Sequence, residues 1–223
     1  NLGQHSLFMS RLVKQVHAFE PFPKTLERFQ HHIELNQIHN IRLHPIGLSD
    51  TNENLTFYAP QSRNQGIGSF DPSTMQKGNV ASEKLEVVKG DDYFAKMKIN
   101  CLDIVKLDVE GFEKKVLLGL QQVLMKHRPI IVCEVSYGKE VSFNSIQQLR
   151  ETLPEEYQLF TFNTRKPDGS KARKRGAKAR KTGTYQLVPF IQWRLSGQDN
   201  VIACPKEKQR ILPMQGIGRI AVP

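Results

Sequence analysis

The sequence has no long hydrophobic run and only three cysteines, and each shortage excludes a class of protein. No apolar stretch reaches the roughly 18 residues that a membrane-spanning helix needs. Cys101, Cys133 and Cys204 are odd in number and widely spaced, and no C-x-x-C pair suggests a zinc site. Their apolar neighbours predict buried, reduced thiols, and we therefore expect a cytoplasmic type of compartment.

Acidic residues are nearly absent from residues 165–181, and this segment carries most of the net charge of +10. It holds nine Lys/Arg against one Asp, a net +8, so the other 206 residues sum to only +2. One interpretation is an electrostatic arm for an anionic partner such as nucleic acid, an acidic glycan or a membrane surface. The other, which we favour, is a mobile, solvated insertion, since stacking aromatics occur only afterwards, at Tyr185, Phe190 and Trp193.

Helical and extended patterns alternate along most of the chain. Apolar spacings of three and four predict helices over 7–13, 23–37, 112–127 and 142–153, the last with Ser142 as N-cap. Apolar runs and alternations predict strands over 15–20, 40–50, 53–60, 84–90, 103–110, 129–136, 156–164 and 200–206, with a long loop at 61–83. This order is typical of an α/β protein with a doubly wound, mostly parallel sheet that ends in an antiparallel hairpin.

We expect one domain over residues 1–204, with a basic insertion at 165–184 and an irregular tail at 205–223. The chain opens with "NLGQHS", without a starting methionine or a signal peptide, and we interpret it as lacking the first strand of the sheet. Gly3 in this turn would allow the backbone to approach a ligand closely.

Acids follow four of the predicted parallel strands: Glu20, Asp50, Asp108 with Glu110, and Glu134. Open α/β sheets bind ligands outside the carboxyl ends of their strands. A carboxylate at that edge costs desolvation free energy unless it meets a hydrogen-bond donor or a cation. The four strand ends therefore predict a ligand that carries donors or positive charge.

Each acid suggests a role and has a structural alternative. The two oxygens of Glu20 match the vicinal hydroxyls of a ribose, and Asp50 can accept from an adenine amino group. Asp108 and Glu110 share one face with Lys106 while the chain is extended. The alternatives are a helix N-terminal acid at Glu20, a turn residue at Asp50, and an ion-paired structural cluster around Lys106.

The stretches "VHAFEPFPKTLERFQHHIELN", "LHPIGLSD" and "IVKLDVEGFEKKVLLGL…RPIIVCEVS" resemble successive motifs of the FkbM-type methyltransferase family. The resemblance runs over residues 1–137 and more loosely to 204. Its most specific marks are the acid–proline pair at residues 20–21 and the "KLDVEG" block. The truncated first motif and the basic insertion depart from the family pattern.

The resemblance implies the Rossmann-like fold of S-adenosylmethionine-dependent methyltransferases and methyl transfer to a hydroxyl of a sugar, glycan or other natural product. By position it implies a cofactor site at Gly3, Ser6, Glu20, Pro21, Ser49 and Asp50. It also implies that Asp108, Glu110 and Glu134 face the methyl-transfer site.

The expected chemistry fits acids at that site. A hydroxyl is a poor acid, so a carboxylate base must take its proton during attack, and Asp108 is our favoured base. Paired acids such as Asp108 and Glu110 raise one pKa toward the working range. We predict no metal, because the motif contains no His; a divalent ion bridging Asp108 and Glu134 is the less favoured variant.

Other functions remain to be weighed. A nicotinamide-dependent dehydrogenase needs G-x-G-x-x-G before Glu20, and "NLGQHSLFMS" does not supply it. Two alternatives stay open: a nucleic-acid-binding or RNA-modifying methyltransferase that uses residues 165–181, and a non-catalytic methyltransferase-like domain.

Overall fold

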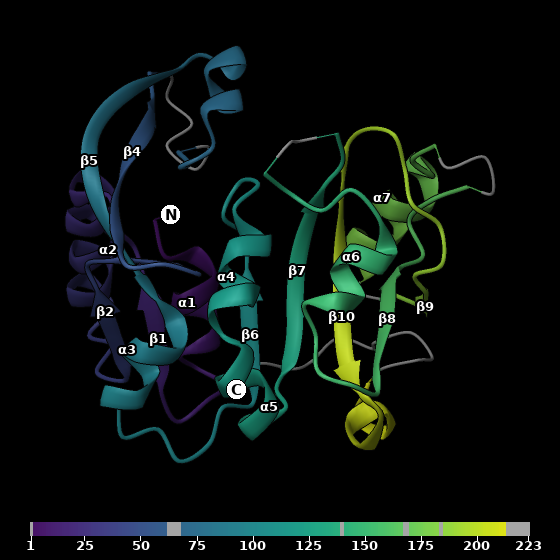
Figure 1. Cartoon of the computed structure of the whole chain (residues 1–223). Coiled ribbons are helices and arrows are strands. Elements are labelled where there is room, and N and C mark those ends of the chain that lie inside the picture. Colours follow the sequence, from purple (N-terminus) through teal and green to yellow (C-terminus); the bar gives the residue numbers. More distant parts are fainter. Residues whose placement is uncertain (1, 62–67, 139–140, 167–169, 183–184, 213–223) are drawn as a thin grey trace. The chain divides into compact units, whose positions relative to one another are not determined.

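The computed structural model describes residues 2–61, 68–138, 141–166, 170–182 and 185–212 of the chain (Figure 1). Its residues fall into two compact units. Unit 1 comprises residues 1–98 and 115–120, and unit 2 comprises residues 99–114 and 121–223. Each unit is described by itself below.

Unit 1 contains two small sheets. Its elements are α1 (Gln4–Met9), β1 (Val16–Phe19), α2 (Pro23–Leu35), β2 (Ile41–His44), β3 (Gly47–Ser49), β4 (Glu53–Pro60), the 3₁₀ helix η2 (Pro72–Lys77), β5 (Asn79–Lys89), α3 (Gly90–Lys96) and most of α4 (Glu113–Gly119). Strands β1 and β2 pair in parallel. Strand β5 lies between β3, to which it is parallel, and β4, to which it is antiparallel.

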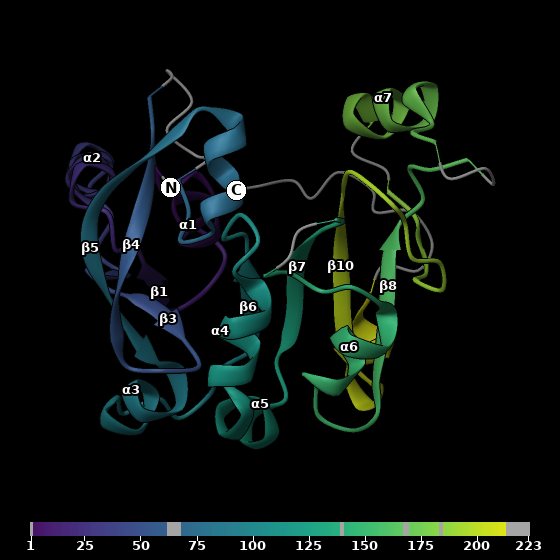
Figure 2. The same ribbon diagram turned by 45° about the horizontal axis from the view of Figure 1, so that its top comes forward.

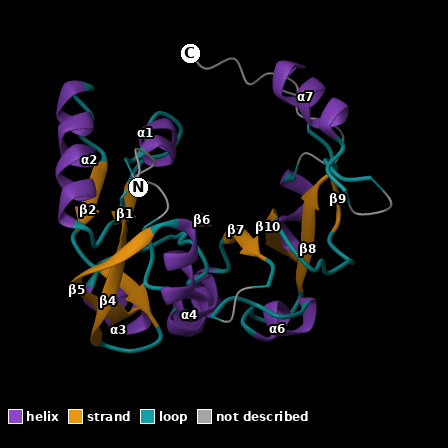
Figure 3. Ribbon diagram, turned by 90° about the horizontal axis from the view of Figure 1, so that it is seen from above, coloured by secondary structure: helices purple, strands orange, loops and turns teal. Residues whose placement is uncertain are grey.

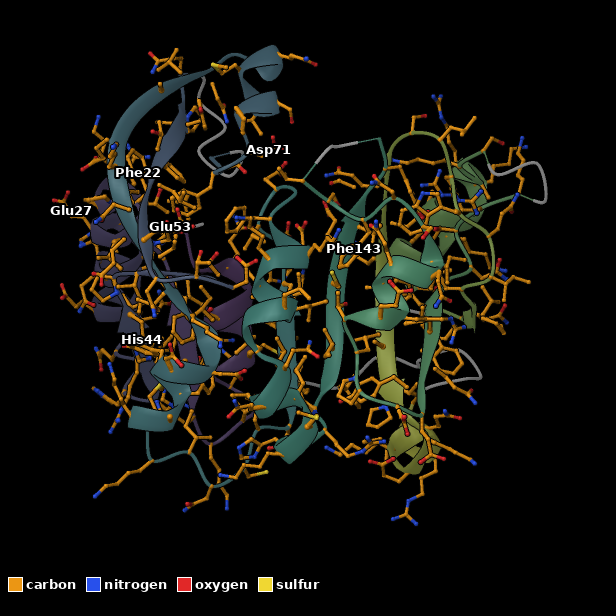
Figure 4. All side chains as sticks on the ribbon, in the orientation of Figure 1. Phe22, Glu27, His44, Glu53, Asp71 and Phe143 are labelled. Carbon is orange, nitrogen blue, oxygen red and sulfur yellow. The ribbon has the colours of Figure 1, made fainter. Side chains whose placement is uncertain are left out.

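Apolar spacing explains how unit 1 packs. Helix α2 starts at Pro23, whose fixed φ suits a first helical position. Phe29 and Ile33 are four residues apart on its inner face and form a core cluster with Ala18 of β1. A second cluster is built around Phe22, labelled in Figure 4, whose ring stacks on Phe57 at 4.8 Å between centroids.

Unit 2 is built on one five-stranded sheet. Its elements are β6 (Ile104–Leu107), α5 (Gln121–His127), β7 (Ile130–Ser136), α6 (Ile146–Glu151), β8 (Tyr157–Phe162), α7 (Arg173–Thr182), β9 (Leu187–Pro189), β10 (Gln198–Pro205) and the 3₁₀ helix η3 (Lys206–Ile211). The strand order is β6-β7-β10-β8-β9. Helix α6 covers one face of this sheet (Figures 1 and 3).

The strand directions in unit 2 define the edge that matters below. Strand β6 runs parallel to β7, and β10 runs antiparallel to both β7 and β8. Strands β6, β7 and β8 therefore point the same way, and we call the edge where they end the carboxyl edge of unit 2. Strands β8 and β10 pair antiparallel as predicted, but α7 and β9 lie between them in the chain and β10 lies between β7 and β8 in the sheet, so they do not form the predicted hairpin at its end.

The predicted single strand over 40–50 is wrong, because it divides into β2 and β3, which belong to different sheets. Pro45 lies at the break, where its missing N–H cannot continue the ladder. Among the described strands, β1 and β2 pair only with each other, and the strands form three sheets rather than one. The mixed α/β class is thus observed, whereas the doubly wound arrangement stays a prediction.

The predicted helix over 112–127 is also divided, into α4 and α5. Gly119 ends α4, and a Cβ there would lie 1.8 Å from the carbonyl oxygen of Ser49, so only glycine permits this approach. The N-cap of α6 is Ser145, which accepts from the backbone N–H of Gln148, and not Ser142, which is buried before the helix begins.

Three further predictions need correction or restriction. The expected loop over 61–83 contains η2 and the start of β5, and the basic insertion contains α7. The expected irregular tail contains η3, and residues 213–223 lie outside the described residues. All three cysteines are free; Cys133 and Cys204 are buried as predicted, but Cys101 is exposed.

Over the part of the chain that the structure describes, we find no helix with the length and apolar character needed to cross a membrane.

Candidate functional site

Two acids lie level with each other toward the carboxyl edge of unit 2. Strand β6 ends at Leu107, which pairs in register with Cys133 of β7, so Asp108, just after β6, and Glu134, within β7, are the next residues along the two chains. The carboxylate of Asp108 lies 3.2 Å from the ammonium of Lys106. The predicted structural alternative, an ion pair with Lys106, is thus present at Asp108.

Glu134 has the perturbed carboxyl group of this edge. Its pKa is raised from 4.5 to about 6, mainly by burial and next by the negative charge of Asp108, whereas Lys106 opposes the rise. The charges of Glu110 and Glu113 make smaller contributions in the raising direction. The carboxyl group with a raised pKa at this edge is therefore Glu134, and burial contributes more to the shift than the neighbouring acids do.

Asp108 and Glu110 were predicted to share a face only while the chain is extended, and the chain is not extended here. The strand has ended before Asp108, and Glu110 has a left-handed φ of 53° in the turn that follows. Gly111 continues this turn at φ 106°. An i, i+2 relation places side chains on one face only in extended chain, so the turn gives Glu110 its own direction.

Glu113, which the sequence analysis did not select, shapes this turn. Its Oε1 accepts from the backbone N–H groups of Val109, at 3.0 Å, and Gly111, at 3.2 Å, and the residue is only 1% exposed. An acid in the first turn of a helix can reach back to preceding N–H groups. That signal was available, since Glu113 opens the helical pattern directly after the "KLDVEG" block.

In unit 1, Glu20 follows β1 and is fixed by the backbone. Its N–H donates to the carbonyl oxygen of His44, which extends the pairing of β1 with β2. Its Oε1 accepts from the N–H of Phe22 at 3.0 Å, and the residue is 7% exposed. Phe22 is the N-cap of α2, so this contact is also the one that the helix N-terminus interpretation predicts.

Gly3 and Ser6 belong to the opening turn and α1. Gly3 is the N-cap of α1 with φ 83°, and a Cβ there would lie 2.1 Å from the ring of Phe29 on α2. The glycine is therefore required both for the backbone conformation and for close packing. Ser6 lies within α1, and Pro21 stands between Glu20 and the N-cap of α2.

Ser49 and Asp50 lie together at the end of β3. The hydroxyl of Ser49 donates to Oδ1 of Asp50 at 3.1 Å, and Ser49 is fully buried. Asp50 also lies 3.8 Å from the ammonium of Lys115 on α4, and both side chains are partly exposed. Asp50 follows β3 rather than the strand that pairs with β1, as the division of residues 40–50 requires.

A second charged cluster in unit 2 was missed. The carboxylate of Asp199, at the start of β10, accepts from Arg165 at 2.8 Å, from Arg194 at 3.1 Å and from the hydroxyl of Tyr137 at 2.9 Å. Burial, followed by the charge of Asp199, raises the pKa of Tyr137. Tyr137 and Arg165 are 62 and 34 residues from Asp199 in the sequence, so no local motif predicts the whole cluster. It ties the segments after β7 and β8 to β10.

The fold and the strand-end acids describe a mixed α/β protein with a carboxylate cluster at one sheet edge, and comparison with known proteins specifies the class. The family model of the methyltransferase FkbM domain matches residues 3–161. The chain therefore belongs to the FkbM methyltransferase family, as the sequence motifs predict.

Individual relatives are more distant. The chain is 28% identical over 137 residues to Methyltransferase 1 of Beauveria bassiana, covering 54% of this chain and 55% of that protein. It thus spans about half the length of this curated relative. A crystal structure of methyltransferase FkbM from Methylobacillus flagellatus has a TM-score of 0.51 and 14% identity, covering 91% of this chain and 40% of that one. This likeness extends to the fold.

Proposed function

We propose that this protein is an S-adenosylmethionine-dependent methyltransferase that methylates a hydroxyl oxygen of a sugar, glycan or other natural product. Membership of the FkbM family supports the class of reaction. The observation that carries the proposal is a carboxyl group with a pKa of about 6, Glu134, beside Asp108 at the carboxyl edge of unit 2. A base with such a pKa is largely ionised at neutral pH and still able to hold a proton.

Glu134 is the better base on this structure, in place of Asp108. Asp108 is engaged by Lys106, whereas the carboxyl group of Glu134 is the one that its surroundings tune. In the proposed step, the hydroxyl oxygen of the acceptor forms a bond to the methyl carbon as its proton passes to the carboxylate of Glu134. Burial contributes most to the raised pKa of Glu134, the charge of Asp108 comes next, and Glu110 and Glu113 add smaller contributions.

Residues of unit 1 have the chemistry to hold the cofactor, whose sulfonium would supply the methyl group. The carboxylate of Glu20, oriented by the N–H of Phe22, suits the two ribose hydroxyls. Gly3 and Ser6 lie where α1 begins, and Ser49 with Asp50 offers acceptors for an adenine amino group. The tight packing at Gly3, where any Cβ would meet Phe29, fits a turn that must keep its backbone close.

The proposal also covers the domain organisation, the cellular compartment and the absence of a metal from the reaction. Both units act together as one methyltransferase domain over residues 1–204 with a Rossmann-like, doubly wound sheet. The protein works in a reducing, cytoplasmic compartment, in keeping with its three free cysteines. No metal takes part, because the carboxyl groups supply the base.

The test is transfer of a labelled methyl group from S-adenosylmethionine to a panel of glycans, lipids and RNA. We expect label in a hydroxyl-bearing acceptor with the wild-type protein and with Lys84→Gln, a surface control remote in sequence from the site. Glu134→Gln should retain cofactor binding and lose transfer. Cofactor binding without transfer to any acceptor class would favour a non-catalytic methyltransferase-like domain instead.

A further inference from the structure

The basic segment contains an ordered element where we predicted a solvated insertion. Helix α7 spans Arg173–Thr182, and six of its ten residues are Lys or Arg, with no acid among them. Figures 2 and 3 both show α7 set off beyond the strands of unit 2. Like charges three and four residues apart on a helix repel each other, so such a helix gains stability from an anionic partner.

The segment before α7 is fixed to the sheet of unit 2. The backbones of Arg165 and Lys171 form an isolated antiparallel β-bridge, and the N–H of Ala172 donates to the carbonyl oxygen of Thr164 at 2.7 Å. The guanidinium of Arg165 forms an ion pair with Asp199 at 2.7 Å, and both side chains are largely buried. The residues that precede α7 are therefore held to the sheet by backbone hydrogen bonds and by a buried ion pair.

The segment after α7 is fixed as well. The N–H of Asn163 donates to the carbonyl oxygen of Gln186 at 2.8 Å, and the ring of Tyr185 meets the ring of Phe162 edge-on at 5.3 Å. The residues on both sides of the basic segment thus contact the sheet near the end of β8.

The helix has two distinct faces. Small residues line its inner side: Ala172, which directly precedes the helix, and Ala179 are 8% and 7% exposed, and Gly176 between them is half-buried. Lys174, Lys178 and Lys181 are exposed. At about 100° per residue these three lysines fall within about 60° of each other, directly opposite the small residues. One side of α7 is therefore built for packing and the other presents a row of ammonium groups.

We propose that the lysine row of α7 is a docking surface for the phosphate backbone of double-stranded nucleic acid. Regularly spaced cations on a rigid helix match a polyanion with regularly spaced phosphates. The apolar residues of α7 are only Ala and Gly, so the helix has no side chains for insertion into a bilayer. It carries no aromatic residue on which unpaired bases could stack, which favours a duplex over a single strand.

The place of α7 in the chain, after β8, relates the lysine row to the carboxyl edge of unit 2. Strand β8, which leads into the basic segment, ends at the carboxyl edge of unit 2, the edge that also carries Asp108 and Glu134. Nucleic acid held by α7 therefore meets the same edge of the sheet as the proposed base. The inference goes beyond the proposed methyl transfer, and a binding assay without cofactor tests it separately.

The experiment measures fluorescence anisotropy of the purified protein with a labelled 20-base-pair RNA duplex between 50 and 200 mM salt. With the three lysines of the row engaged, we expect the affinity to fall about 40-fold over this range. Lys174→Gln/Lys178→Gln should weaken binding at 50 mM at least about tenfold and reduce the fall with salt to about 3.5-fold.

A matched control removes the same charge elsewhere. Lys84→Gln/Lys98→Gln changes two exposed lysines of unit 1 and should leave the affinity within about twofold, and circular dichroism confirms that both double variants are folded. Equal weakening by the two double variants would overturn the proposal, because net charge alone would then explain binding. Binding to vesicles rich in anionic lipid without binding to the duplex would overturn it in favour of a membrane surface.

Discussion

Acids follow strands in both units of this protein, but the two sets have different surroundings. In unit 1, Glu20 accepts from a backbone N–H, and Asp50 accepts from a hydroxyl and lies near a lysine. In unit 2, burial, followed by the charge of Asp108, raises the pKa of Glu134 to about 6. Carboxylates that already accept hydrogen bonds in a fixed orientation suit binding to a ligand, whereas a carboxyl group with a raised pKa suits proton transfer.

The comparison shows why residue type and position alone do not assign a role. Asp108 occupies the most specific motif of the sequence, yet its nearest charged partner is Lys106 in its own strand. Glu134 has no comparable motif, and its burial and neighbours make it the group with the perturbed pKa. The predictions that follow test this division of roles.

The largest effect is expected for Glu134→Gln. An amide keeps the shape of the side chain but cannot take the acceptor proton, so turnover should fall about 100-fold to 10,000-fold. Initial rates of labelled methyl transfer at pH 7.5 provide the measurement. Retention of wild-type turnover would remove Glu134 from the role of base.

A smaller effect is expected for Asp108→Asn. In the wild type, kcat/KM should rise with pH around a midpoint of about 6 as Glu134 loses its proton. Removing the charge of Asp108 lowers the pKa of Glu134 and should move this midpoint to lower pH, while the rate at pH 7.5 changes less than about tenfold. An unmoved midpoint would show that Asp108 does not act through Glu134.

The smallest effect concerns stability. The pKa of Glu134 is about 6 when folded and 4.5 when unfolded, so between these values the folded state holds more proton and its stability falls as pH rises. Because the residue is only partly buried and solvent screens its charge, the loss between pH 4 and 7.5 should be about 1 kcal/mol. Urea unfolding at both pH values should show this loss in the wild type but not in Glu134→Gln. A loss of equal size in the variant would assign it to other groups.

Helices and strands that are marked by apolar spacing along the chain were predictable from the sequence, whereas features set by tertiary contacts were not. The apolar stripe of α2 and the buried run of β7 identify those elements directly. The division of α4 from α5 depends on the approach of Gly119 to Ser49, a residue 70 positions away. The same holds for Asp199, whose three donors come from separate loops.

The candidate site shows the same limit. The strand-end acids were predictable because period-two patterns end at them, and the family motif at "KLDVEG" added weight. The direction of the Glu110 side chain was not predictable, because it depends on a left-handed turn whose backbone N–H groups donate to Glu113. The preference for Glu134 over Asp108 was not either, because it depends on burial and on which acid Lys106 engages.

Calorimetric titration of S-adenosylmethionine into the wild type, Glu20→Gln and Glu134→Gln tests the division of roles most directly, since it needs no knowledge of the acceptor. Glu20→Gln should bind S-adenosylmethionine about tenfold to 100-fold more weakly than the wild type, because it loses charge-assisted hydrogen bonds to the ribose. Glu134→Gln should bind within about threefold of the wild type. Wild-type affinity in Glu20→Gln, or equal weakening in both variants, would contradict the account.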